Sequence, residues 1–556
     1  MALRFTEQLD SADRALEGTG RLALCLGSGI SRRKLPLLAQ LIASAFRNLP
    51  HTAQADQLFL AVSRGQVFHL RLADMGITTA QPCTLDEFRG LADAVQADIC
   101  NELINTYGDV FRDVESVYGS KRELLEAIDI EQFERAVPDV SHFYIAYLLI
   151  EGNISRVLTT NWDRLIEKAV AVSTSKPTND FLTVAKDDAT WLQRGERNTA
   201  VLAKVHGCAT QYPTQCEQIV ITTPELQVAA ANGWRQDAVT EFLSGPTLFS
   251  GYSGSDYTLM VPTKVIDVLR KANALPAARY FVAEDKDLTA GALQLSGDRP
   301  DHHLRMYAND TFTSLYFAAL RTRFKQAVEL AGQQTRPERA FTRWSDAEWD
   351  ELVRRLHHLL EVDLPSLLDD AIGLPGLRTY DESVGTIPVR LSELREMFIE
   401  GRVQHPNLYR PFRFDRIKDL VLLTLIAAFV ELKAGRALSL SLNNEIAGLN
   451  FIESTGAVRT VCFVYGTYAP AVVPMVTSYL NDLEASLGPL PSFEVLIIPC
   501  SEYKVGTIPS FAPRPVLAKH LPGIATAIRT FVNPDVIFGA SDFADLISRL
   551  RSELGV

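Results

Sequence analysis

The apolar run LALCL (Leu22–Leu26) and the turn GSGIS (Gly27–Ser31) that follows it decide the fold that this sequence predicts. The run is typical of a buried strand, and the two glycines predict a tight turn that leads into a helix near Leu35. Glycine lets a ligand's phosphates approach the backbone, and a helix N-terminus favours their negative charge. Strand–helix turns also need glycine for geometry, so this motif by itself leaves both a nucleotide site and a plain turn open.

Further apolar runs alternate with helical patterns through the first 330 residues. They lie at 156–160, 201–205, 218–222, 247–252, 279–283 and 304–307. This alternation predicts an α/β fold with a Rossmann-like parallel sheet and right-handed crossovers. Residues from about 52 to 150 have mostly helical periodicity, which predicts a large helical insert. Ligands of such sheets bind at the carboxyl ends of the strands.

The rest of the chain predicts a second region. The polar stretch QQTRPE (333–338) is typical of a linker. We therefore expect a domain at 1–332, a helical connector at 333–372 and a smaller C-terminal α/β region at 373–556. Strands are predicted there at 460–465, 493–499 and 536–538.

Composition limits the classes of function. The formal net charge of −12 argues against a broadly basic nucleic-acid surface. None of the seven cysteines forms a C-x-x-C pair, so neither a zinc ribbon nor a disulfide framework is expected. Polar residues directly after Phe5 do not predict a secretory signal, and the apolar run 420–430 is too short to span a bilayer. We expect a cytoplasmic chain with no membrane segment.

Three later motifs follow predicted strands. They are TTNWD (159–163), KVHG (204–207) and GYSGSD (251–256). Each has a plain structural explanation: Asn161 caps a helix, His206 makes a structural hydrogen bond, and the third motif forms a turn. On the other explanation, all three line a ligand site at the strand ends.

The four motifs in this order resemble the sirtuin-like family, in particular its bacterial antiviral branch that degrades NAD. The family patterns are G-[AS]-G-x-S, T-[TQ]-N-[YW]-D, K-[LV]-H-G and G-Y-S-x-x-D, and the resemblance covers about residues 15–330. It implies hydrolysis of the nicotinamide–ribose bond of NAD, with NAD as substrate and no metal.

Two departures from the family concern protein deacylation. Deacylases of this family carry a four-cysteine zinc module, which this sequence lacks. They also continue the first loop as G-I-P-x-F-R, where this chain has RRKLP (32–36). Both departures disfavour an acyl-lysine substrate.

The resemblance also implies residue roles. His206 would be the general base toward a ribose hydroxyl or water, and Asn161 would orient the ribose or the attacking water. The residues expected to bind NAD are Gly27, Ser28, Gly29, Ser31, Thr160, Asp163, Gly251, Ser253 and Asp256.

Taken together, these inferences predict an NAD hydrolase effector of a prokaryotic antiphage or antiplasmid defence system. When triggered, it would cleave NAD to nicotinamide and ADP-ribose and stop growth of the infected cell. Control would act through 333–556, by a nearby-encoded protein partner (a short Argonaute, an ATPase or a nucleotide-processing protein) or a nucleotide signal. A homo-oligomer is also expected.

The alternatives are a non-hydrolytic module that binds NAD or ADP-ribose, and, third, an NAD-dependent protein deacylase. The trigger and the choice between ADP-ribose and its cyclic isomer stay open.

Overall fold

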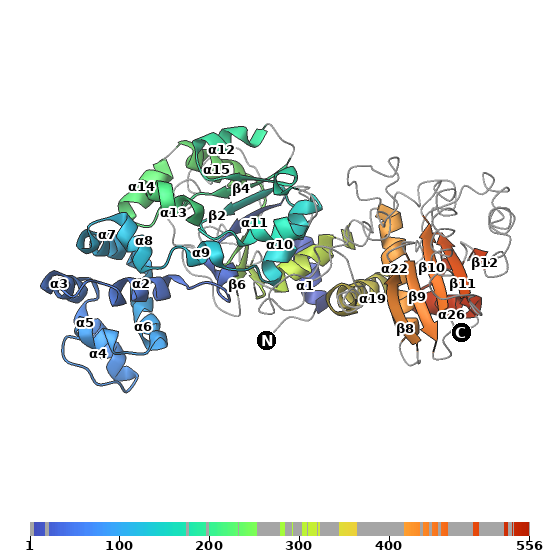
Figure 1. Cartoon of the computed structure of the whole chain (residues 1–556), viewed down its shortest axis with the longest axis horizontal. Coiled ribbons are helices and arrows are strands. Elements are labelled where there is room, and N and C mark those ends of the chain that lie inside the picture. The colour runs from blue at the N-terminus through green and yellow to red at the C-terminus, as the bar shows by residue number, and fades with distance from the viewer. Residues whose placement is uncertain are drawn as a thin grey trace, which may run out of the picture. The chain divides into compact units, whose positions relative to one another are not determined.

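The structure is a computed structural model of the 556-residue chain. It describes residues 5–16, 22–173, 177–195, 199–231, 233–252, 279–283, 292, 303–307, 310–319, 321–322, 344–363, 416–433, 438–443, 448–453, 458–464, 493–499, 528–531, 536–537 and 539–554. The chain divides into two compact units, Met1–Tyr316 and Phe317–Val556 (Figure 1).

A seven-stranded sheet, in strand order β3-β4-β2-β1-β5-β6-β7, forms the centre of the first unit. Every neighbouring pair is parallel. The strands are β1 (Ala23–Leu26), β2 (Arg156–Thr159), β3 (Leu182–Ala185), β4 (Ala200–Lys204), β5 (Thr247–Ser250), β6 (Arg279–Ala283) and β7 (His303–Arg305). The predicted α/β fold with a Rossmann-like parallel sheet is confirmed.

Two details of the strand prediction were wrong. Residues 218–222 form no strand, since they connect a 3-10 turn (Cys216–Gln218) to α14 (Thr223–Ala231). The segment contains apolar residues because Ile219 and Ile221 are fully buried and contribute to the core of the helical insert. Strand β3 was missed because it is short and its two middle residues are only partly buried, which weakens the apolar pattern.

Helices cover both faces of this sheet. Lys204 of β4 reaches Glu167 on α11 (Leu165–Val172), which packs beside α10 (Val140–Ile150). The adjacent Ala203 instead packs in a cluster with residues of α12 (Asp188–Leu192) and α15 (Gly233–Leu243). Since successive side chains of a strand point to opposite faces, these helices form two layers around the sheet.

The segment between β1 and β2 is helical, as predicted (Figure 1). Its helices include α2 (Leu38–Arg47), α3 (Ala53–Val62), α4 (Gly65–Asp74), α5 (Leu85–Arg89), α6 (Asp93–Cys100), α7 (Tyr107–Tyr118), α8 (Lys121–Ala127) and α9 (Gln132–Arg135). The sequence places caps at several starts. Thr84 and Glu87, for example, form a reciprocal capping box at the start of α5.

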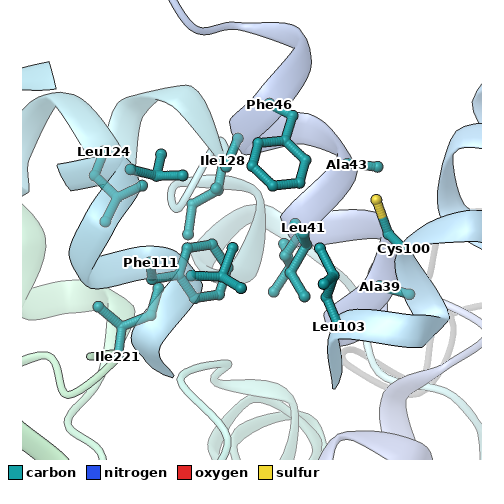
Figure 2. Close-up of a cluster of buried hydrophobic side chains, with 14 of the residues drawn as sticks. Ala39, Leu41, Ala43, Phe46, Cys100, Leu103, Phe111, Leu124, Ile128 and Ile221 are labelled. Atoms are coloured by element: carbon teal, nitrogen blue, oxygen red, sulfur yellow. The ribbon is translucent and has the colours of Figure 1, made fainter. Parts of the chain in front are cut away.

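This insert has a hydrophobic core of its own. Figure 2 shows side chains of α2, α7 and α8 meeting around Leu41, Phe46 and Phe111, with Ile221 reaching in from the segment before α14. Phe46 is fully buried, and its ring lies 5.2 Å from that of Phe59 in an edge-to-face arrangement. Trp162 of the TTNWD motif packs on the same core. The core thus connects the insert to one of the loops at the strand ends.

The second unit contains a five-stranded mixed sheet, in strand order β12-β11-β10-β9-β8. Its strands are β8 (Leu438–Asn443), β9 (Gly448–Glu453), β10 (Val458–Val464), β11 (Phe493–Pro499) and β12 (Ile528–Phe531). Its helices include α19 (Asp346–His358), α22 (Arg416–Lys433) and α26 (Phe543–Leu554). The predicted C-terminal α/β region is confirmed. The strand expected at 536–538 is wrong, because residues 536 and 537 are helical.

In the described ranges, the helices are all too short or too polar to cross a bilayer.

The core of the insert gives a stability prediction. Phe46→Ala removes a fully buried ring, so we expect it to lower the free energy of unfolding by about 3–5 kcal/mol. Leu70→Ala is the matched control on α4: this side chain is 61% exposed, and we expect a change within about 0.5 kcal/mol. Urea denaturation of the full chain measures both. Equal destabilisation by the two substitutions would contradict the assignment of this core.

Candidate active site

Four strands bring the sequence motifs to one edge of the sheet. Leu26 at the end of β1 pairs with Thr159 of β2 and with Ser250 of β5, and Thr159 pairs with Lys204 of β4. The chain builds β2, β3 and β4 on one side of β1 and then β5, β6 and β7 on the other. The carboxyl ends of β1 and β5 therefore form the switch point of the sheet, where ligands of parallel α/β sheets bind.

Three glycines interlock at this switch point. A Cβ atom on Gly27 would lie 2.4 Å from the carbonyl oxygen of Gly251, and one on Gly29 would lie 2.7 Å from the Gly251 Cα. Gly251 has a φ of +66°, and a Cβ there would lie 2.5 Å from the nitrogen of Ile30. No larger residue fits these positions unless the backbone moves.

The interlock also uses backbone hydrogen bonds. The N–H of Gly27 donates to the Ser250 carbonyl (3.0 Å), and that of Gly29 donates to the Gly251 carbonyl (2.9 Å). In this conformation the two amides are therefore engaged with the last residue of β5 and the first residue after it. Ser28 between them is exposed, whereas Ser31 is buried. The structure thus gives the glycines a packing role, and phosphate binding by Gly27, Ser28 and Gly29 stays a prediction.

Asn161 does not cap a helix. The helix after this motif, α11, begins four residues later, at Leu165. The Asn161 side chain is 8% exposed, and its Nδ2 donates to the carbonyl oxygen of Gly27 (3.2 Å). Because that partner only accepts, the amide nitrogen must face it. The Oδ1 atom then makes no hydrogen bond within the described residues, which leaves it available to accept one from a ligand.

Asp163, which the sequence analysis expects to bind NAD, makes two structural contacts. Its Oδ1 accepts the backbone N–H of Leu165 (3.1 Å), which stabilises the start of α11. Its Oδ2 accepts the hydroxyl of Ser31 (3.0 Å), from the glycine loop. Asp163 is only 6% exposed. It therefore supports the site from behind by joining the loop after β1 to the loop after β2.

A buried ion pair lies under the same loop. Lys204 is 1% exposed, and its Nζ donates to Glu167 Oε1 (3.1 Å) and to the backbone carbonyl of Asp163. Burial would lower the pKa of Lys204, but the negative charges of Glu167, Cys208 and Asp163 and the hydrogen bond to Glu167 together outweigh it, so the pKa lies above its usual value. Lys204 therefore stays charged and ties β4 to the loop that carries Asn161.

His206 lies two residues beyond Lys204, and Asn161 lies two residues beyond the partner of Lys204, Thr159. The two residues thus follow neighbouring paired strands at matching positions along the chain. His206 is 5% exposed. The two loops are also joined directly, since the N–H of Ala209 donates to the Trp162 carbonyl (2.9 Å).

The turn after His206 is held by α15, which lies on the other face of the sheet from α11. Gly207 has a φ of +84°, and a Cβ there would lie 2.6 Å from the Gln218 carbonyl oxygen. Arg235 on α15 is 9% exposed and donates to the carbonyls of Val205 (2.8 Å) and Gln218 (3.4 Å). The glycine and the buried arginine together fix the direction in which the chain leaves β4.

The remaining predicted site residues have different outcomes. Thr160 is partly buried, and its N–H donates to the Leu26 carbonyl (3.3 Å). Gly251 belongs to the interlock. Ser253 and Asp256 lie outside the described residues. In the described ranges, His, Cys, Asp and Glu side chains form no group of three that could hold a metal ion.

Sequence reasoning missed several supporting residues. Thr159 uses its hydroxyl twice, donating to the Leu26 carbonyl (3.0 Å) and accepting the N–H of Asn161 (3.0 Å). Glu167 and Arg235 are buried charged residues on helices. A lysine at the end of an apolar strand signals that a buried partner exists, but only the fold reveals that this partner is Glu167.

The interlock gives a prediction with a matched control. Gly251 and Gly152 both have positive φ (+66° and +70°), but nothing lies within 4 Å of a Cβ built on Gly152. We expect Gly152→Ala to destabilise the chain by about 1–2 kcal/mol through backbone strain. Gly251→Ala adds overpacking, for a total of about 2–5 kcal/mol. Thermal unfolding of the two variants measures the difference. If both lose the same stability, the glycines do not interlock.

Comparisons with known proteins match part of this chain to a known family. Residues 155–313 match the family model of the SIR2-like domain. A solved structure from work on the structural basis for the mechanism and regulation of Sir2 enzymes is 11% identical, with a TM-score of 0.29, over 57% of this chain and 99% of that one. None of the curated proteins matches the chain. The matched range includes Asn161 and His206, so the family model supports a sirtuin-like family for this part of the chain.

Proposed function

We propose that the first unit hydrolyses the bond between nicotinamide and ribose in NAD. The arrangement that carries the proposal is that Asn161 and His206 each follow one of the paired residues Thr159 and Lys204 at the carboxyl ends of β2 and β4. Asn161 also contacts the glycine loop, and the Asn161 and His206 loops are joined to each other. The SIR2-like match over 155–313 supports NAD as the ligand. The resemblance of the four motifs to the NAD-degrading branch supports cleavage over simple use of the cofactor.

The chemistry follows from the residue types. When the bond between C1′ and nicotinamide breaks, its electron pair leaves with nicotinamide, and C1′ gains oxocarbenium character. Water then attacks C1′ and loses a proton, so that NAD and water give nicotinamide, ADP-ribose and a proton. His206 is the general base for that proton, because an imidazole is suited to this task near neutral pH.

Asn161 positions the reacting groups. Its Nδ2 is fixed on the Gly27 carbonyl, so its Oδ1 accepts a hydrogen bond from the ribose or from the attacking water. Holding such a group in place lowers the barrier by removing the need to find the correct orientation. Gly27, Ser28, Gly29, Ser31, Thr160, Asp163 and Gly251 form or support the wall of the NAD site. Ser253 and Asp256 would hold the adenosine half.

We further propose that the chain is an effector of antiphage or antiplasmid defence. In this proposal residues 1–332 form the hydrolase domain, 333–372 connect it, and 373–556 receive a protein or nucleotide signal. An enzyme that destroys NAD must be kept inactive until it is needed, and the second unit has its own sheet on which such control could act.

Substitution of the two central residues tests the hydrolase. We expect Asn161→Ala and His206→Ala each to lower nicotinamide release from NAD by about 10²- to 10⁴-fold, because each removes a group that acts at the reacting centre. His69→Ala is the control: His69 lies on α4 of the insert and contacts Thr79 and Gln81. We expect it to keep full activity. Nicotinamide and ADP-ribose are measured by chromatography with the full chain, with and without the product of the neighbouring gene.

Three outcomes would contradict the proposal. Binding of NAD without any product, under conditions that activate the wild-type chain in cells, would favour a binding module. Full nicotinamide release by a folded double variant would place the chemistry elsewhere. Release that depends on an acyl-lysine peptide would indicate a deacylase.

A further inference from the structure

A line of buried polar side chains runs from α10 to the glycine loop. Asp139 is the N-cap residue of α10, and its Oδ1 accepts the N–H of Ser141 (3.1 Å). His142, in the first turn, is fully buried, and its Nδ1 lies 2.7 Å from Asp139 Oδ1. On the other side of the ring, Nε2 lies 3.2 Å from Ser31 Oγ. The line therefore connects the insert's last helix to the loop after β1.

The direction of the hydrogen bonds follows from the last member. Asp163 Oδ2 can only accept when the carboxyl group is ionised, so the hydroxyl of Ser31 donates to it (3.0 Å). The oxygen of Ser31 must then accept from its other neighbour. A proton on Nε2 of His142 fills that role, and a second proton on Nδ1 faces the Asp139 carboxylate. The imidazole thus fixes the rotation of the Ser31 hydroxyl, and the hydroxyl fixes the carboxylate of Asp163.

Asp139 holds the ring from the other end. Burial would raise the pKa of Asp139, but hydrogen bonds from His142 and from the amides of Ser141 and His142 together lower it. The carboxylate therefore stays ionised beside the ring. An ionised partner at 2.7 Å makes the orientation of the imidazole well defined.

These distances also match those of a serine nucleophile with a histidine base and an aspartate. Two observations argue against that role here. Ser31 is only 2% exposed, so a substrate cannot approach its oxygen in this conformation. Its proton already points to Asp163, away from His142. Ser31, His142 and Asp139 therefore position neighbouring groups and do not carry out a nucleophilic attack.

We propose that His142 is a positioning residue that sets the place of Asn161 through Ser31 and Asp163. The loops after β1 and β2 are joined by two side-chain contacts, Asn161 to the Gly27 carbonyl and Ser31 to Asp163. His142 controls the second contact, and the second contact restrains the segment that carries Asn161. This inference rests on the proposed NAD hydrolysis for its kinetic readout, but its structural readout is independent of that function.

Two conservative substitutions distinguish the contribution of Nε2 of His142 from that of Nδ1. The amide of glutamine reaches about as far as Nε2 and can donate to Ser31, whereas that of asparagine reaches only as far as Nδ1 and keeps the Asp139 contact. We expect His142→Asn to lower kcat for nicotinamide release by about 10- to 100-fold, with KM changed less than about threefold, because misplacement acts at the reacting centre. His142→Gln should stay within about threefold of the wild-type kcat. His69→Asn on α4 is the matched control.

A double substitution tests whether His142 acts through Ser31. Ser31→Ala removes the hydroxyl that links the two groups, so His142→Asn should have no further effect on kcat in that background. Independent, additive losses would overturn the proposal. Equal kcat values for His142→Asn and His142→Gln would also overturn it, since the Nε2 side of the ring would then not matter.

Amide hydrogen exchange gives the readout that does not require catalysis. In folded protein with wild-type melting temperature, His142→Asn and Ser31→Ala should increase exchange in peptides covering 27–31 and 159–165, and His142→Gln should not. Unchanged exchange in these peptides in both variants would refute the inference even if NAD is hydrolysed. If the wild-type chain releases no nicotinamide but exchange changes as expected, the inference holds and the proposed function fails.

Discussion

At the switch point of the sheet, the backbone of the loop after β1 touches the backbone of the loop after β5, and the rest of the site depends on this contact. Gly27 and Gly29 lie so close to Gly251 that a single added methyl group on any of them would overlap the backbone of the opposite loop. Two backbone hydrogen bonds fix the register of this contact. The loops after β1 and β5 consequently behave as one wall, and the other motifs are placed relative to that wall.

Polar contacts connect the glycine loop to the loop after β2, and that loop to β4 and α11. Asn161 reaches the Gly27 carbonyl, Ser31 reaches Asp163, and Lys204 reaches the Asp163 carbonyl and Glu167. Nearly all of these groups are more than nine-tenths buried, where an unpaired polar group would be costly. Each substitution in the network therefore affects the positions of its neighbours, and a reacting group such as Asn161 is held by residues that never touch a substrate.

The parallel sheet, the insert and the positions of the motifs could be predicted because they rest on local patterns: apolar runs, helical periodicity and glycine after a strand. The role of Asn161 could not, because a helix cap and a contact with Gly27 share the same sequence signal and differ only in tertiary structure. The same holds for His142, whose partners lie 111 residues before it and three residues before it. Residues 218–222 were misassigned because apolar residues buried in a helical core look like a short strand.

In the proposed function, the edge formed by the glycine loop, Asn161 and His206 holds the nicotinamide ribose of NAD. A crystal structure of the full chain with a carbocyclic NAD analogue, which resists hydrolysis, tests it most directly. We expect the ribose carbon that bears nicotinamide to face Asn161 and His206, with hydrogen-bonding atoms within about 3 Å directly or through one water. An analogue bound away from the carboxyl ends of β1, β2 and β4, or with its nicotinamide ribose turned away from both side chains, would contradict it.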